Sequence, residues 1–469
     1  MASILSADPV LHLLRRATYG VTADLVAEAR SRGRAGWLDD QLHPERVSDS
    51  GMNQILGYYP LLSASEAELR ALPDQKRRDA TSQLIDATLA RQLWSRRQLF
   101  ELMVEFWNNH FNATPSHSTY ATKALEDRTV MRANALGRFE DLLLADGKSA
   151  PMMFYLGNFR SELDNPNENY GRELLELHTV GLDSGFTQTD VWNSALTLTG
   201  RTIDDDGFFF YDKNLHYTGQ VQVLGWSASN ASASGGMAVG DDDLRYLARH
   251  PKTATHLSRK LAIRFVSDNP PASLVSMLAD VYLDSGTAIV PWLLALFNSA
   301  EFAASVGLKR KRPIEHYAAS MRALGIEALP DNGMSEIKAM LKRVGGLGMT
   351  PFGSLPPTGY PDTTAAWESV SGTLKRWNLH HALSTASAGP LFYPPLDQLL
   401  AGPTPATAGA MVDRLCVALT GQVFTAAHRG AVLGYAGMTA SEPYDPEATE
   451  HYLTSLVVLI LDSAYHTLR

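Results

Sequence analysis

The sequence contains a single cysteine, Cys416, among its 469 residues. One cysteine cannot build an intramolecular disulfide framework or a zinc site made of several thiolates. Cys416 lies within the apolar stretch 415–419, so we expect a small buried side chain there rather than an exposed nucleophile. Disulfide-rich scaffolds and cysteine-based zinc domains are therefore excluded.

Long hydrophobic runs are also missing. The most apolar stretch, 453–461, is far shorter than the ~20 residues needed to cross a bilayer. Residues 1–5 show neither the basic opening nor the apolar run of a secretory signal. We expect no membrane span and, for the sequence as it stands, a cytoplasmic location, with a periplasmic or secreted location if a signal has been removed.

Basic residues are outnumbered, with 41 Lys and Arg against 50 Asp and Glu and a formal net charge of -9. Proteins that bind nucleic acids usually present a basic face to the phosphates, so we predict no nucleic-acid partner. The run 309–312, Lys-Arg-Lys-Arg before Pro313, departs from this background. It is either an anion-binding or localisation-type cluster, or a stretch that is solvated or paired with carboxylates.

Familiar catalytic motifs are absent as well. The sequence has no Gly-rich phosphate loop, no Gly-x-Ser-x-Gly elbow and no dinucleotide fingerprint after a predicted strand. It also lacks the Glu-x-x-His and His-Glu-x-x-His pairs in its central helical segment. These absences disfavour kinases, dinucleotide oxidoreductases, serine esterases, di-iron bundles and zincins.

Apolar residues that recur at three- and four-residue steps are abundant, above all in the first third of the chain. This spacing is typical of amphipathic helices, so we predict a mainly α fold. The segments 208–211 and 220–223 flank polar turn residues and predict a small β-hairpin insertion near 205–225. The stretch 227–240 is predicted to be a flexible loop, and the Gly- and Pro-rich stretch 345–364 a loop near the functional pocket.

The segment 164–181 carries the strongest local signal. Asn165 suits an N-cap, Pro166 a first helical position and Gly181 a helix end, which predicts a helix over 166–180. At 100° per residue, one face of this helix gathers three carboxylates, an arginine and an amide. These residues are Glu168, Asn169, Arg172, Glu173 and Glu176.

This charged face has two interpretations. Exposed to solvent, it is a ladder of ion pairs that contributes about 0.2–0.5 kcal/mol per pair. Facing a cavity, its carboxylates would perturb each other's pKa values and supply a general acid and base, or bind a cation. On the second interpretation, we predict catalytic roles for Glu168, Glu173 and Glu176.

Two histidines are the predicted partners of these carboxylates. His178 shares the apolar side of the helix, which is also typical of a packed core histidine. His110 lies in the cluster 106–111, whose polar groups could orient a ligand. No cofactor is predicted, although a divalent metal near His110 is an open alternative. The predicted substrate-binding residues are Trp107, Asn109, Asn167, Asn169, Arg172, Asp190, His216, Tyr360 and Trp367.

Several segments resemble a bacterial family known as domain-of-unknown-function family 1800. The matching segments are 12–20, 106–111, 167–181, 186–191, 198–200, His216, 250–254, 309–315, 359–362, Trp367 and 377–378. The resemblance implies a single mainly helical domain over 1–469, with the loop around Tyr360 and Trp367 folded over the pocket. It supplies no activity, and it suggests a sulfatase-like partner only by association.

The sequence departs from the family pattern at Asn108, Arg201, Tyr217 and Val221, where relatives usually have His, Trp, Asp and Lys, respectively. We therefore carry two hypotheses. The first is a hydrolase-like enzyme that acts on a polar polymer or ester through the carboxylate and histidine cluster. Its substrate would be a small molecule or a glycan-like chain. The second is a non-catalytic binding or assembly protein, in which the same polar network is buried and structural.

Overall fold

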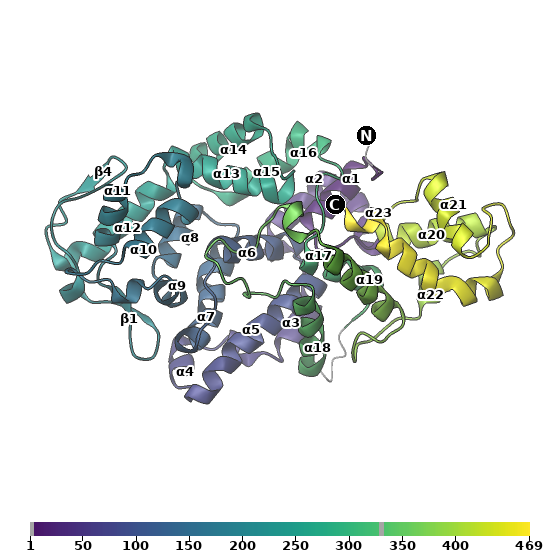
Figure 1. Cartoon of the computed structure of the whole chain (residues 1–469), viewed down its shortest axis with the longest axis horizontal. Coiled ribbons are helices and arrows are strands. Elements are labelled where there is room, and N and C mark those ends of the chain that lie inside the picture. Colours follow the sequence, from purple (N-terminus) through teal and green to yellow (C-terminus); the bar gives the residue numbers. More distant parts are fainter. Residues whose placement is uncertain (1–3, 328–332) are drawn as a thin grey trace.

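The computed structural model describes residues 4–327 and 333–469, and most of them are helical. Figure 1 shows an elongated arrangement of helices in which both chain ends lie near the middle. The helices of the first third, where the periodicity was clearest, are α1 (Pro9–Ala17), α2 (Ala23–Leu42), α3 (Ser50–Leu56), α4 (Glu66–Arg70), α5 (Asp74–Trp94), α6 (Gln98–His110), α7 (Tyr120–Glu126), α8 (Phe139–Asp146) and α9 (Ala150–Tyr155).

Helices also dominate the remainder of the described chain. They are α10 (Glu168–Glu173), α11 (Gln188–Thr197), α12 (Gly236–Ala248), α13 (Pro251–Phe265), α14 (Ala272–Asp284), α15 (Ile289–Asn298), α16 (Ala300–Ala304), α17 (Pro313–Ala323), α18 (Gly333–Gly346), α19 (Val370–Ser384), α20 (Ala408–Thr420), α21 (Ala426–Tyr435), α22 (Pro446–Asp462) and α23 (Ala464–Thr467). The mainly α fold predicted from the sequence is confirmed.

The β structure is a small insertion, as predicted, but its pairing differs from the prediction. The strand β1 (Arg201–Ile203) pairs with β2 (Phe209–Tyr211), and β3 (Val221–Val223) pairs with β4 (Trp226–Ala228). Both pairs are antiparallel, so the insertion holds two short hairpins. The sequence suggested that 208–211 and 220–223 pair with each other, because nearer partners at 201–203 and 226–228 have no comparable apolar pattern.

The stretches predicted as loops are partly regular. Within the predicted loop 227–240, the first residues belong to β4 and the last residues to α12, which begins at Gly236. Between them, a 3-10 turn at Ala233–Gly235 is the regular element. In the second stretch, α18 continues to Gly346, and the loop runs from there to a 3-10 turn at Thr364–Trp367.

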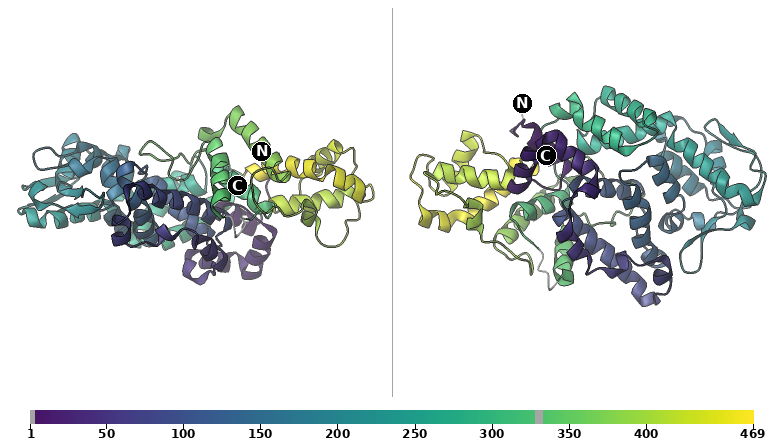
Figure 2. Two further views of the ribbon diagram at one scale, coloured as in Figure 1. Left: turned by 90° about the horizontal axis from the view of Figure 1, so that it is seen from below. Right: turned by 180° about the vertical axis from the view of Figure 1, so that it is seen from behind.

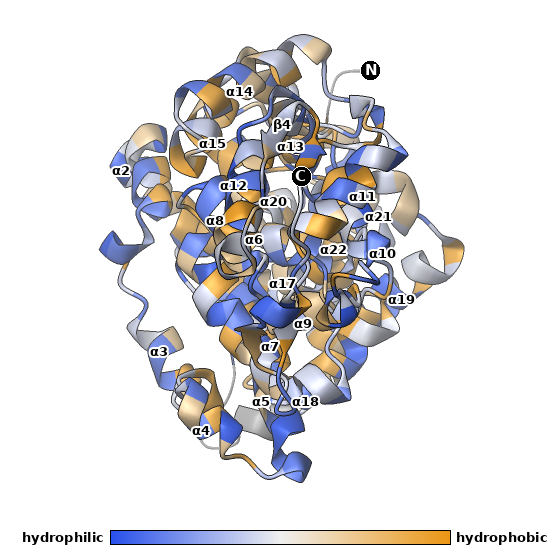
Figure 3. Ribbon diagram, turned by 90° about the vertical axis from the view of Figure 1, so that its left-hand side faces the viewer, coloured by the Kyte–Doolittle hydropathy of each residue, from blue (hydrophilic) through white to orange (hydrophobic). Residues whose placement is uncertain are grey.

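A hydrophobic core runs through the length of the molecule, from Leu5 to Tyr465 in sequence. Figure 3 shows apolar and polar residues interleaved along most helices, as expected where one face packs inward. Cys416 belongs to this core and is fully buried, which confirms its predicted role. Burial raises the pKa of its thiol to about 12.

The C-terminal helices return to the middle of the molecule. Figures 1 and 2 show α20, α21 and α22 at one end, with α23 leading back toward α1. Helix α19 packs against α22, and α17 packs against both α19 and α20. This brings together side chains that are far apart in the sequence. The described chain contains no helix with the length and apolarity required to span a bilayer.

Candidate functional site

The predicted helix over 166–180 begins later and ends differently than expected. Asn167, not Asn165, is the N-cap of α10, and its side chain accepts hydrogen bonds from the backbone N–H groups of Asn169 and Tyr170. After Glu173 the chain widens into a π-helix over Leu174–His178. The widening departs from a regular α-helix. Glu176 nevertheless stays on the face of Arg172, and His178 is buried with Leu174 and Leu175, as the 100° projection predicted.

The charged face of this helix forms the ion-pair ladder that was one of its two interpretations. Arg172 lies 3.7 Å from Glu168 and 3.7 Å from Glu176, with side chains 38%, 40% and 22% exposed, respectively. The half-buried Glu173 differs, because burial and then Glu176 raise the pKa of its carboxyl. Neither the cavity beside Tyr360 nor the cavity above His380, described below, is lined by these carboxylates.

His110 and His178 are buried next to each other. The His110 Nε2 donates a hydrogen bond to the His178 carbonyl (3.1 Å), and the Lys260 ammonium donates to the His110 Nδ1 (2.8 Å). Burial and then Lys260 lower the pKa of His178 to about 3 and that of His110 well below its usual range. Both imidazoles are therefore neutral at pH 7, and Trp107 packs edge-on against His110.

The loop that carries Tyr360 is held by the end of α6. The Asn109 side chain donates to the Tyr360 carbonyl (2.6 Å) and accepts from the Tyr360 N–H (2.5 Å). Trp367 packs near the Tyr360 ring and donates its indole N–H to the Pro361 carbonyl (2.9 Å). Asn109, Tyr360 and residues 349–352 line a cavity of about 50 Å³.

The other predicted binding residues have local hydrogen-bond partners. Asp190 closes a capping box with Thr187 and accepts from the Leu224 N–H (2.8 Å). His216 is buried, with its Nε2 2.9 Å from the Asn230 Oδ1. The side chain of Asn169 donates to the Leu156 carbonyl (3.2 Å). The structure thus distributes the predicted residues over several places instead of gathering them in one pocket.

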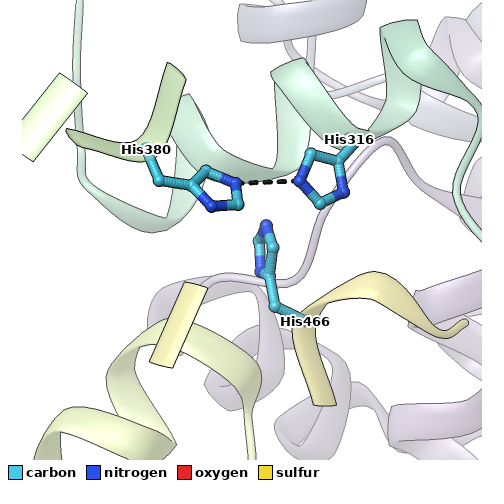
Figure 4. Close-up of side chains that lie close together, drawn as sticks. All are labelled: His316, His380 and His466. Carbon is cyan, nitrogen blue, oxygen red and sulfur yellow. Dashed lines mark hydrogen bonds between the residues drawn. The ribbon is translucent and has the colours of Figure 1, made fainter. Parts of the chain in front are cut away.

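A second polar centre, which the sequence analysis did not single out, lies where α17, α19 and α23 meet. His316, His380 and His466 are all buried, and each offers a ring nitrogen within 4.8 Å of the other two. Figure 4 shows the three rings pointing toward one another from three separate segments. We call these three residues the histidine centre. The Nε2 atoms of His316 and His380 are 2.8 Å apart.

Neighbouring groups fix the orientation of two of these rings. The His380 Nδ1 lies 2.5 Å from the Asp462 Oδ1, so Nδ1 carries the proton and Nε2 keeps its lone pair. The His466 ring bonds to the Leu419 backbone, and its Nε2 lies 3.0 Å from the Ser320 Oγ. A carboxylate or carbonyl behind an imidazole is the arrangement that supports metal-binding histidines.

Burial keeps the histidine centre neutral. It is the largest cause of a lowered pKa at His316, His380 and His466, and the neighbouring imidazoles lower the pKa values of His316 and His466 further. Lys311 donates to the His466 carbonyl from behind, and burial lowers the pKa of its amine to about 7. Neutral imidazoles are the form that binds metal ions.

Two members of the histidine centre, His316 and His380, line a cavity of about 180 Å³. We call it the histidine cavity. His316, His380 and Asp462 lie on its wall, and its other lining residues are Arg310, Thr373, Arg376, Trp377, Ala464, Thr467 and Leu468. A buried cluster of imidazoles with an adjoining cavity can hold an ion and leave room for a second ligand.

One residue of the basic run 309–312, Arg310, lines this cavity. Lys309 pairs with Asp268 (2.5 Å), Arg312 with Glu105 (2.6 Å) and Arg310 with Glu368 (3.1 Å). Lys309 and Arg312 are buried, so pairing with carboxylates is confirmed for most of the run, whereas solvation is wrong for these two residues.

The sequence spacing did not predict the histidine centre, because its members are 64 and 86 positions apart. One pattern in the sequence could have pointed to His380. Thr373, Arg376 and His380 recur at helical steps and share one face of α19. In addition, the segments 309–315 and 377–378, which carried the family resemblance, lie just before His316 and His380.

The fold and this centre define a mainly helical protein with a buried histidine cluster. The chain belongs to a family described as "Protein of unknown function (DUF1800)", whose model matches residues 12–468, almost the whole chain. No curated protein and no solved structure matches the chain significantly.

Proposed function

We propose that the protein is a metal-dependent hydrolase that acts on a polar ester at the histidine centre. The observation that carries this proposal is the convergence of three buried, neutral imidazoles beside the histidine cavity. Catalytic zinc sites typically have three protein ligands and one open position for water or substrate. The histidine centre has the ligand number, and the cavity supplies the room for a fourth ligand.

The distances are close to those a metal requires. Zinc binds imidazole nitrogens at about 2.0–2.1 Å in tetrahedral geometry, which places two nitrogens roughly 3.3 Å apart. The His316 and His380 Nε2 atoms are 2.8 Å apart, and all ligand atoms lie within 4.8 Å. Rotations of the rings that move these atoms by about half an ångström to an ångström would bring them to tetrahedral spacing.

A divalent ion held by these histidines would lower the pKa of a water molecule and polarise an ester oxygen. The chain's own residues would do the rest. Asp462 holds the His380 ring in place, and Ser320, whose hydroxyl donates to the His316 carbonyl, lies beside the Nε2 atoms that would bind the ion. The buried surroundings limit the access of bulk water to the imidazoles. The reaction would take place at the mouth of the histidine cavity.

This proposal keeps the hydrolase hypothesis but places the active site at the histidine centre instead of at the carboxylates of 168–176. The catalytic roles of Glu168, Glu173 and Glu176 stay predictions, because their face forms a partly exposed ladder. A metal near His110 is less favoured than one at the histidine centre, because Lys260 already occupies the His110 Nδ1. The glycan-like substrate and the sulfatase-like partner also stay predictions.

The alternative is a non-catalytic binding or assembly protein whose buried polar network is structural. One observation favours it. A separation of 2.8 Å between two imidazole nitrogens is an ordinary hydrogen bond, and Ser320 lies within hydrogen-bond distance of both His380 and His466. The histidines, on this view, bond to each other and need no ion.

Metal titration separates the two functions. We would measure Zn²⁺ content after purification, and Zn²⁺ affinity by calorimetry, for the wild type and for His380→Gln and His381→Gln. His381 is the adjacent, exposed residue on α19, so its substitution is a matched control. We expect stoichiometric binding in the wild type and in His381→Gln, and a loss of at least tenfold in His380→Gln.

Hydrolysis would then be assayed on chromogenic acetate, phosphate and glycoside esters, with and without a chelator. We expect activity on at least one ester that disappears with the chelator and in His380→Gln. Zinc binding that is absent from the wild type, or equal in both variants, contradicts the metal site and leaves the structural network as the function of the centre.

A further inference from the structure

Arg376 projects into the histidine cavity from the same face of α19 as His380. The two residues are one helical turn apart, and both line the cavity. The Arg376 side chain is half-buried and donates a hydrogen bond to the Thr373 Oγ1 (3.0 Å). Within the part of the chain that the structure describes, Arg376 forms no ion pair, which is unusual for a guanidinium withdrawn from water.

A second guanidinium faces the same space. Arg310 lines the histidine cavity and also the smaller cavity next to it, which Arg376 shares. Arg310 is paired with Glu368, and both side chains are about half exposed. Burial, and then the charge of Arg310, lower the pKa of Arg376. The charge of Glu368 acts in the opposite direction on Arg376, and an anion within the histidine cavity would further offset the repulsion between the two cations.

The balance of charge around the cavity points the same way. Its lining includes Arg310 and Arg376 as cations and only Asp462 as an anion. Asp462 already accepts a hydrogen bond from His380, which reduces its repulsion of a bound anion. Because Glu368 pairs with Arg310 from outside this lining, Arg376 is the cation of the lining for which the described residues provide no ion pair. It lies in a chain whose formal net charge is -9.

We infer that the histidine cavity binds the oxyanion of an anionic ester, a phosphate or a sulfate, with Arg376 as its main protein contact. This inference rests on the proposed function and names its substrate class. A guanidinium binds two oxygens of a tetrahedral anion at once, which orients the ester as well as attracting it. Arg310, which also lines the cavity, adds charge.

The reaction on such an ester balances with water alone. The oxygen of one water molecule forms a bond to phosphorus or sulfur, and the bond from that atom to the ester oxygen breaks. The departing oxygen takes a proton from the water and leaves as an alcohol, so nothing is oxidised or reduced. The cavity, at about 180 Å³, is smaller than typical pockets for whole drug-sized ligands. It therefore admits the anionic group, while the leaving alcohol lies near the exposed ring of Trp377.

Anion titration tests the inference. Inorganic phosphate and inorganic sulfate would each be titrated calorimetrically into zinc-loaded wild type, Arg376→Gln and Lys375→Gln. Lys375 is the exposed neighbour on α19, so its substitution removes the same charge from the same helix without touching the cavity. We expect the anion to bind the wild type and Lys375→Gln with similar affinity, and Arg376→Gln at least tenfold more weakly, with zinc affinity unchanged in all three.

The outcomes are distinguishable. Tighter binding of phosphate assigns a phosphate ester, and tighter binding of sulfate a sulfate ester. If zinc binds but neither anion does, or if acetate binds as tightly as both, the inference is wrong while the metal site stands. If zinc does not bind, the proposed function fails first. If Arg376→Gln binds the anion as tightly as the wild type does, Arg376 is not its main contact and the inference is wrong. If Arg376→Gln does not fold, the wild-type titrations still decide whether the protein binds such an anion.

Discussion

The Nδ1 of His380 and the Oδ1 of Asp462 lie 2.5 Å apart, although 82 positions separate the two residues in the sequence. This hydrogen bond joins α19 to the end of α22, two helices that pack against each other. It fixes the tautomer of His380 and turns its Nε2 toward the other members of the histidine centre.

Removing this carboxylate should weaken metal binding without removing a ligand. In Asp462→Asn, we expect Zn²⁺ affinity to fall about 10- to 100-fold, because the amide holds the ring and its tautomer less firmly. Calorimetric titration measures the change. Asp413→Asn, which removes a carboxylate paired with Arg429, is the control and should bind zinc as the wild type does. Equal affinity in both variants would show that Asp462 does not support the ligand.

The buried histidines should make the protein less stable in acid. His178 has a pKa of about 3 in the folded chain, against a usual value of 6.5. Between these values the unfolded chain binds the proton and the folded chain does not. The contribution of His178 is therefore lost as the pH falls below about 6.5, by about 1.4 kcal/mol per pH unit.

Comparison with a variant isolates this effect. Burial raises the pKa of Asp243 to about 7, which has the opposite sign because the folded chain then binds the extra proton. We would therefore measure the free energy of unfolding between pH 7 and pH 5 in the wild type and in His178→Gln. The variant should lose less stability over this range, by about 2 kcal/mol. Parallel curves would mean that His178 is charged in the folded protein or never buried.

Gly171 should be intolerant of a side chain because α10 and α11 touch there. A Cβ at this position would lie 2.7 Å from the Val191 carbonyl oxygen and 2.9 Å from the Ala195 nitrogen, and both are backbone atoms. Gly171→Ala should therefore lower the free energy of unfolding by about 1–3 kcal/mol. Gly430→Ala, in α21, meets nothing within 4 Å and should be neutral or stabilising. Denaturant unfolding would measure both variants. If Gly171→Ala is as stable as Gly430→Ala, α10 and α11 are further apart than the structure shows.

The loop around Tyr360 should loosen when Asn109 is removed. Both hydrogen bonds of the Asn109 side chain go to the Tyr360 backbone, so Asn109→Ala leaves that backbone without these partners at a cost of about 1–3 kcal/mol. Limited proteolysis should cut the stretch 347–363 several times faster. Asn378→Ala, at an exposed position on α19, is the control. Unchanged cleavage would mean that the other side chains bonded to this loop, which include Asn112 and Thr114, hold it without Asn109.

The sequence predicted those features that depend on neighbours along the chain. Helical periodicity located α5 and α6, and the apolar surroundings of Cys416 indicated its burial, because both follow from side chains three or four positions apart. The start of α10 was misplaced by two residues at its N-cap, since Asn165 and Asn167 are equally good caps and only packing chooses between them.

The candidate site was beyond the reach of such patterns. The charged face of 168–176 was correctly seen as a row of partners, but whether it met water or a cavity depended on what packs over it. The burial of His178 followed the predicted apolar side of the helix, but the π-helix over Leu174–His178 did not follow from any standard repeat.

Composition and periodicity thus determined by themselves that this chain is mainly helical, lacks disulfides and carries polar clusters at 106–111 and 164–181. Only the tertiary structure decided that the side chains of His316, His380 and His466 lie next to one another. The physical reason is that a helix fixes relations between residues a few positions apart, whereas the meeting of α17, α19 and α23 is set by burial of apolar surface summed over the whole core.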